Sequence, residues 1–169
     1  MELIIFPPTK NTTDLIQTYI DKVDAVVAHR ILGGFYWQPP LSCVPDVSVE
    51  KQRGETIPEY KFSTKLTDQT NYTEHMNNYV CALAMPDKPF VATITGWLGT
   101  TVQHVLTFDK VTFPMFMDQY QSHKNTHLVM GREMKARLRA CRLKRELDQV
   151  FYSYNIDEIE IRDALDALK

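Results

Sequence analysis

The sequence is short of glycine and lacks the glycine-rich loops that bind phosphate groups in nucleotide-dependent enzymes. Six of its 169 residues are glycine, and neither G-x-G-x-x-G nor G-x-x-x-x-G-K-[ST] occurs. The nucleophile motif G-x-S-x-G and the zinc motif H-E-x-x-H are missing as well. These absences weaken an enzyme hypothesis, and we expect no cofactor.

The spacing of the cysteines and the length of the apolar runs argue against disulfide-rich, zinc-binding and membrane-spanning proteins. Cys43, Cys81 and Cys141 are an odd number and form no C-x-x-C pair, so they predict neither a disulfide framework nor a structural zinc site. The longest internal apolar run, residues 80–85, is far below the roughly 18 residues of a membrane-spanning helix. The N-terminus has no basic segment typical of a signal peptide. We therefore expect a cytoplasmic protein without a membrane partner.

Charge is distributed unevenly along a chain whose formal net charge is only −2. Residues 124–145 contain eight lysines and arginines against one acid, Glu133. Residues 146–169 reverse this, with seven acids against Arg162 and Lys169. Because both stretches have helical periodicity, the pattern predicts a basic surface followed by an acidic one.

Apolar periodicity predicts an α+β fold in one domain, residues 1–169. An apolar stripe that includes Ile16, Val23 and Ile31 predicts an N-terminal helix, which Gly33-Gly34 would end. The connections after residues 85 and 98 are short and favour antiparallel hairpins. We expect a sheet of about four to five strands in residues 1–123, with residues 124–169 as charged C-terminal helices packed on it. Strands are expected at residues 3–6, 60–66, 79–85, 90–98 and 102–108, with 46–49 as an option.

The second half of the chain reads as helices. One is expected to begin at Thr112 and to stop before His123, and a long one to run from about Thr126 to Tyr154. Asp157, with Glu160 three residues later, predicts a capped final helix. The long helix carries two apolar stripes on different sides. One contains Val129, Ala136, Ala140, Leu143, Leu147, Val150 and Tyr154; the other contains Met130, Met134, Leu138 and Cys141.

Four cations lie between the two stripes at 3–4–3 spacing and are called the basic row: Arg132, Lys135, Arg139 and Arg142. Arginine forks match carboxylate and phosphate oxygens. The row therefore predicts a non-enzymatic binding, regulatory or assembly protein with an anionic macromolecular partner. A protein partner is favoured over nucleic acid, because the acidic C-terminal stretch would compete for the same cations. Self-association is a further expectation, since two apolar stripes exceed what one domain covers.

The basic row has two other interpretations. Salt-sensitive binding of nucleic acid would use the same basic row on a phosphate backbone. In the other, the row binds nothing outside the chain and pairs with the acids of the final helix, which are Asp157, Glu158, Glu160, Asp163 and Asp166.

An aromatic triplet forms a second candidate surface. Phe35, Tyr36 and Trp37 precede Pro39-Pro40 in a stretch that otherwise reads as loop. Rigid aromatic side chains beside proline are suited to anchor a protein partner. The alternative is that the three rings cover the core at the edge of the sheet.

A small cysteine- or histidine-dependent enzyme of unknown substrate is the remaining alternative. His104 alternates with Val102 and Leu106, so on a strand it would face the apolar side and need a polar partner. Cys81 on a neighbouring strand would make a nucleophile and base pair, whereas a hydroxyl partner would make His104 a core residue. We expect no metal site, because His123 and His127 have no third ligand nearby in the sequence.

Overall fold

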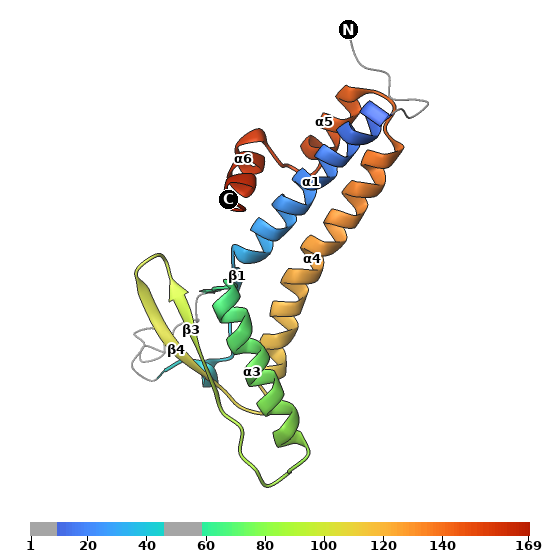
Figure 1. Cartoon of the computed structure of the whole chain (residues 1–169). Helices are drawn as coiled ribbons and strands as arrows, with labels where there is room; N and C mark the ends of the chain where they lie inside the picture. The colour runs from blue at the N-terminus through green and yellow to red at the C-terminus, as the bar shows by residue number, and fades with distance from the viewer. Residues whose placement is uncertain (1–9, 46–58) are drawn as a thin grey trace. The chain divides into compact units, whose positions relative to one another are not determined.

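The computed structural model describes residues 10–45 and 59–169 (Figure 1). The predicted α+β class is confirmed, with a four-stranded antiparallel sheet, an N-terminal helix and a helical C-terminal region. The chain forms two compact units, residues 32–123 and residues 1–31 with 124–169, called here the sheet unit and the helical unit. The single domain stays a prediction, and the strands expected at residues 3–6 and 46–49 lie outside the described residues.

The sheet unit is built on an antiparallel sheet with the order β1-β2-β3-β4. Its strands are β1 (Phe35–Trp37), β2 (Tyr60–Phe62), β3 (Ala92–Leu98) and β4 (Val102–Phe108). The predicted hairpin of β3 and β4 is confirmed, and its tight turn includes Gly99 at φ +68°, a conformation that favours glycine. A short 3₁₀ turn, η1 (Leu41–Cys43), follows β1.

Phe116, on the helix α4 (Phe113–Ala140), lies at the centre of the sheet unit's core and is fully buried. Strand alternation turns Phe35, Phe62 and Phe108 to this side of the sheet. The ring of Phe116 lies 5.0–6.4 Å, centroid to centroid, from those of Phe35, Trp37, Phe62, Tyr72, Phe108 and Phe113. One face of the sheet is therefore closed by aromatic packing.

The prediction of a strand at residues 79–85 is wrong, because most of this stretch forms the last turn of the helix α3 (Leu66–Leu83). The apolar run is not buried as a strand would be. Tyr79 and Ala82 pack inward at helical spacing, while Val80 is exposed. Periodicity cannot separate a short apolar run in a strand from one in a helix, and the inward residues here continue the face of the preceding polar turns.

The helical unit contains α1 (Lys10–Leu32), the second half of α4, α5 (Lys144–Ser153) and α6 (Glu158–Asp166). The predicted end of α1 is confirmed, with Gly34 at φ +83° just after it. Gly131 lets α1 and α4 approach closely, since an added Cβ would lie 2.8 Å from Cγ2 of Val27. Residues at the centre of this core include Val23, Val26, Met134, Leu138, Leu147 and Ile156.

The two helices predicted on either side of His123 are one helix. The start near Thr112 is confirmed, but α4 runs unbroken to Ala140, so the predicted stop before His123 and restart near Thr126 are wrong. The polar residues between them include no glycine or proline. Without a residue that interrupts the hydrogen-bond ladder, a helix continues through a polar stretch.

The helix expected to reach Tyr154 instead ends at Ala140, and α5 starts at Lys144, after three intervening residues. Leu143 is extended, with φ −125° and ψ 148°. The Arg142 guanidinium donates to the carbonyl oxygens of Ala140 (3.0 Å) and Cys141 (3.3 Å), which stabilises a helix end whose carbonyl groups lack partners within the helix. The predicted cap of the last helix is confirmed, because Asp157 Oδ1 accepts from the Glu160 backbone N–H at 2.8 Å.

None of the helices in the described ranges has both the length and the apolar character needed to cross a membrane.

We predict that Phe116→Ala lowers the free energy of unfolding of the sheet unit by about 3–5 kcal/mol, because it empties the centre of an aromatic core. Urea unfolding followed by tryptophan fluorescence measures this unit, since both tryptophans, Trp37 and Trp97, lie in it. Val105→Ala, at a side chain that is 55% exposed, is the control and should change the value by less than about 0.5 kcal/mol. Equal effects of the two substitutions would contradict the central role of Phe116.

Candidate functional site

The structure divides the basic row into two engaged and two exposed cations. Lys135 forms an ion pair with Asp24 of α1, and Arg142 donates to the carbonyl groups at the end of α4. Arg132 and Arg139 are exposed on α4, and the described part of the chain provides neither with a hydrogen bond or an ion pair. Seven residues, about two helical turns, separate them, so they form the accessible part of the row.

Exposed apolar side chains surround these two arginines. Leu128 and Val129 are each 43% exposed, and Ala136 and Ala140 are exposed as well. Helical geometry places them on the same side of α4 as Arg132 and Arg139. We call Leu128, Val129, Arg132, Ala136, Arg139 and Ala140 the outer face of α4.

The break after Ala140 explains why one predicted apolar stripe is buried and the other is only partly buried. Met134 and Leu138 of one stripe are buried in the helical core. The other stripe is divided by the break. Its part on α5, with Leu147 and Val150, is buried, whereas its part on α4 belongs to the exposed outer face.

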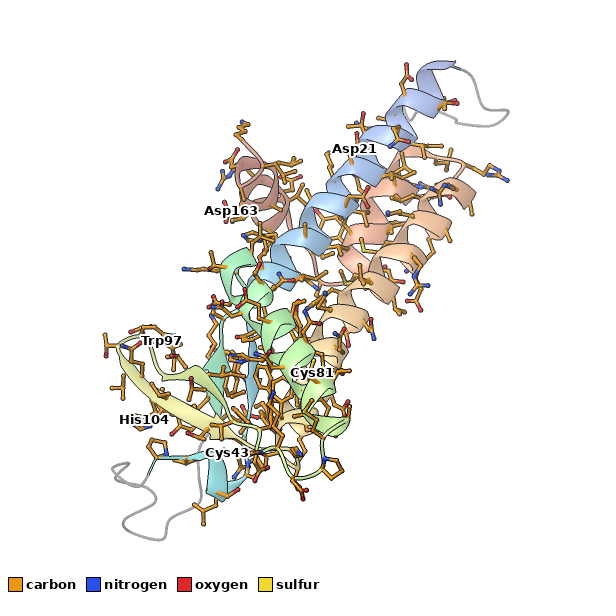
Figure 2. The ribbon with its side chains drawn as sticks, turned by 60° about the horizontal axis from the view of Figure 1, so that its bottom comes forward. Asp21, Cys43, Cys81, Trp97, His104 and Asp163 are labelled. Atoms are coloured by element: carbon orange, nitrogen blue, oxygen red, sulfur yellow. The ribbon has the colours of Figure 1, made fainter. Side chains whose placement is uncertain are left out.

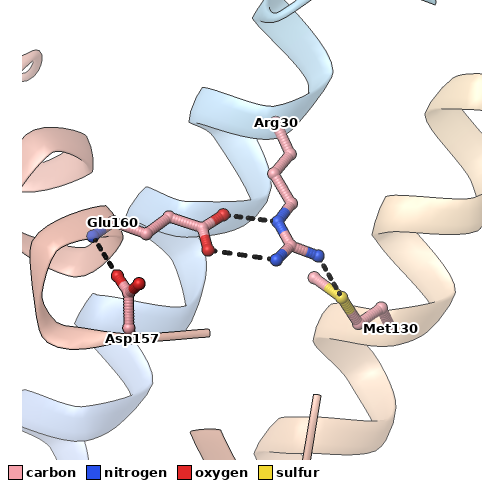
Figure 3. Close-up of polar contacts among 4 residues, drawn as sticks. All are labelled: Arg30, Met130, Asp157 and Glu160. Atoms are coloured by element: carbon pink, nitrogen blue, oxygen red, sulfur yellow. Dashed lines mark hydrogen bonds and ion pairs between the residues drawn. The ribbon is translucent and has the colours of Figure 1, made fainter. Parts of the chain in front are cut away.

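The acidic helix α6 pairs with α1 (Figure 3). The Glu160 carboxylate accepts from Nε (2.5 Å) and from the terminal NH2 (3.0 Å) of Arg30, and the other terminal nitrogen of Arg30 lies 3.4 Å from Sδ of Met130. Within the described residues, no contact joins the acids of α6 to Arg132, Lys135 or Arg139. One of the acids that could have paired with the basic row, Glu160, therefore pairs with Arg30 of α1 instead.

Strand alternation divides the aromatic triplet, which forms β1 rather than a loop. Phe35 is buried, and the ring of Trp37 stacks on that of Phe108 at 6.1 Å. Tyr36 points to the opposite side and is 64% exposed, with Nζ of Lys61 5.8 Å from its ring centroid. Of the three rings, Tyr36 is the one that a partner can reach.

The weak catalytic candidates Cys81 and His104 lie on different elements, well apart in Figure 2. Cys81 is exposed on α3. His104 on β4 has Nδ1 2.7 Å from the Tyr60 hydroxyl. The Tyr60 ring reaches it across Gly96, where an added Cβ would lie 2.9 Å from Cδ1 of that ring. The partner of His104 is thus a hydroxyl, which is the arrangement expected of a structural histidine.

Sequence reasoning missed a groove of about 640 Å³ in the sheet unit. One wall is the face of the sheet opposite to Phe116, with Lys61, Thr95 and Trp97; polar residues of α3, including Asn71, form the other. The alternation of Thr93, Thr95 and Trp97 with buried residues was a signal of an accessible strand face. No comparable sequence signal predicts that α3 lies beside this strand face.

The buried Tyr72 positions the backbone at Ser63, which lines this groove. Its hydroxyl donates to the backbone carbonyl of Ser63 at 2.5 Å, and the Ser63 hydroxyl donates to the Asp68 carboxylate at 2.5 Å. Burial, with smaller contributions from the charges of Asp68 and Tyr120, raises the pKa of Tyr72 well above its usual value. The neutral phenol therefore belongs to the folded state.

The described ranges contain no group of three or more histidine, cysteine, aspartate or glutamate side chains placed to hold a metal ion. Comparison of the chain with protein-family models, curated proteins and solved structures found no match.

We predict that the pair Arg30 and Glu160 couples by about 1–2 kcal/mol in a double-mutant cycle of alanine substitutions, because the pair is bidentate and its side chains are 26% and 24% exposed. Urea unfolding followed by far-ultraviolet circular dichroism measures the coupling. Lys169 and Asp166, 82% and 57% exposed, are the control pair and should couple by less than about 0.5 kcal/mol. Similar values for both pairs would contradict a structural role for the contact between α1 and α6.

We also predict that Tyr72→Phe weakens the alkaline loss of stability. A raised pKa in the folded state means that Tyr72 stabilises the fold fully below its unfolded value, near pH 10, and that this contribution is lost as pH rises toward the folded value. The urea midpoint, followed by tryptophan fluorescence, should fall less steeply above about pH 10 in the variant. Parallel curves for the two proteins would show that Tyr72 does not control this transition.

Proposed function

We propose that this chain is a non-enzymatic binding or assembly protein that contacts an acidic protein surface through the outer face of α4. The observation that carries the proposal is the exposure of Arg132 and Arg139, two turns apart on one helix, without an ionic partner in the described residues. The acidic helix α6 is engaged with Arg30 instead, through Glu160.

The spacing of the two arginines suits a partner helix. Seven residues at 1.5 Å each place them about 10 Å apart along α4. A helix with carboxylates at positions i and i+7 repeats that distance. Each guanidinium can donate two parallel hydrogen bonds to one carboxylate, which fixes direction as well as charge.

The apolar part of the outer face supports a protein partner. Ala136 and Ala140 are small and allow close approach of another helix, and Leu128 and Val129 add apolar area. Protein interfaces commonly combine an apolar centre with arginine and a polar rim. A phosphate backbone would leave these apolar side chains without complementary contacts.

Overall charge also favours protein over nucleic acid. The helical unit has 13 lysines and arginines against 12 aspartates and glutamates. Non-specific binding of nucleic acid depends on a surplus of cations that displaces counterions along the backbone. A long polyanion would meet as many acids as bases on this unit, whereas a short acidic helix can be confined to the outer face.

We predict that Arg132→Glu with Arg139→Glu weakens binding of an acidic helical peptide by about 30-fold or more, because two attractive contacts become repulsive. The probe is a synthetic helix with glutamates at i and i+7 beside an alanine and leucine stripe, and isothermal titration calorimetry gives the affinity. Lys88→Glu with Arg162→Glu is the matched control: it changes the net charge equally at two exposed positions outside the outer face. The control should bind like the unmodified chain.

An equal loss in both double variants would contradict the outer face as the binding surface. Duplex DNA titrated in parallel tests the nucleic-acid alternative. If the DNA binds more tightly than the peptide, with a steep dependence on salt and on Arg132 and Arg139, the partner is nucleic acid. Far-ultraviolet circular dichroism establishes that each variant is folded.

A further inference from the structure

Four side chains form a row across the accessible face of the sheet. Tyr36 of β1 pairs with Lys61 of β2, Lys61 with Trp97 of β3, and Trp97 with Gln103 of β4. Residues paired directly in adjacent antiparallel strands share a face, with Cβ atoms about 4.5–5.5 Å apart. The row therefore alternates an aromatic ring, a cation, a second ring and an amide.

Trp97, Lys61 and Lys65 line the groove with groups that can still bind a ligand. Trp97 is half-buried and lines the groove near the tip of the β3–β4 hairpin (Figure 2). In the described residues its indole has no hydrogen bond or ring contact, and neither Lys61 nor Lys65 has a carboxylate partner. Both lysines line the same groove. Asp68 places a carboxylate in the lining of this groove, and that carboxylate already accepts a hydrogen bond from the Ser63 hydroxyl.

The lack of a side chain at Gly34 leaves room for the side chain of Lys61. A Cβ on Gly34 would lie 3.1 Å from Cε of Lys61 and 2.7 Å from the Phe62 carbonyl oxygen. The absence of a side chain lets the aliphatic part of Lys61 pass over the backbone, and Nζ lies toward the Tyr36 ring. The ammonium group is thereby placed beside the groove, on the same sheet face as Trp97.

We infer that the groove binds a nucleotide, with the base against Trp97 and the phosphate on Lys61 and Lys65. Its volume, about 640 Å³, lies within the range of small-molecule sites. Aromatic side chains stack on bases of any sequence, and lysine ammonium groups bind phosphate as point charges. Asn71, Thr95 and Gln103, which also line the groove, supply donors and acceptors for the base edge and the sugar. This site is independent of the outer face of α4.

The nucleotide has two sources, which an experiment can distinguish. A free mononucleotide would use Trp97 and the two lysines. A single strand would also place its next base on Tyr36, which lies on the other side of Lys61 in the row. Sequence-independent binding of single strands combines such rings with cations along the backbone.

The test is calorimetric titration of the full chain with AMP, adenosine, inorganic phosphate and a short single-stranded oligonucleotide. We expect AMP to bind at least about tenfold more tightly than adenosine or phosphate, and to quench tryptophan fluorescence. Lys61→Gln with Lys65→Gln should weaken AMP binding about tenfold or more, and Trp97→Leu by a similar factor. Trp97→Phe keeps a ring and should retain the affinity within about threefold while abolishing the quench.

Two controls separate this site from other effects. Lys88→Gln removes an exposed lysine outside the groove, and Arg132→Glu with Arg139→Glu removes the outer face of α4; neither should change AMP affinity. An oligonucleotide that binds about 100-fold more tightly than AMP and is weakened by Tyr36→Leu identifies a single strand as the ligand. Equal affinities identify the free nucleotide.

Three results would overturn the inference. One is no binding of AMP or the oligonucleotide at millimolar concentration, and another is equal affinity for AMP and phosphate. The third is unchanged AMP binding after the Lys61 and Lys65 substitutions. These lysines are accessible side chains outside the core, so this variant decides the matter even if Trp97→Leu fails to fold.

Discussion

The aromatic packing around Phe116 is the constraint on which the sheet unit depends. Phe116 contacts rings from β1, β2, β4 and α3, so it fixes which face of the sheet is closed. Because side chains alternate along a strand, closing one face leaves Tyr36, Lys61 and Trp97 on the other. The candidate nucleotide groove is thus a consequence of how the core is filled.

In the helical unit, a different contact decides which charges remain available. The Glu160 carboxylate of α6 accepts hydrogen bonds from Nε and one terminal nitrogen of Arg30, and Lys135 forms an ion pair with Asp24. Arg132 and Arg139 are left at the surface with exposed apolar neighbours. The charge reversal along the sequence therefore does not become a simple internal pairing of basic and acidic helices, and the described residues offer Arg132 and Arg139 no acidic partner.

Local rules predicted those elements whose signals are local. The hairpin of β3 and β4, the end of α1 and the Asp157 cap follow from alternation, glycine and a short polar side chain. The end of α3 was misread as a strand because a short apolar run has no period of its own, and the break at residues 141–143 was missed because tertiary contacts and Arg142 stabilise it. The basic row was identified, but which of its members are free depends on α1. The groove was missed, because its walls come from segments separated in the sequence.

We propose that the two units carry separate binding surfaces of different chemistry. Chemical-shift mapping by nuclear magnetic resonance tests it directly, with the acidic helical peptide and AMP added in turn to the labelled full chain. We expect the peptide to shift amide signals around Arg132, Ala136 and Arg139, and AMP to shift those around Lys61 and Trp97. Shifts from both ligands on the same residues, or peptide-induced shifts centred on α6 rather than α4, would contradict it.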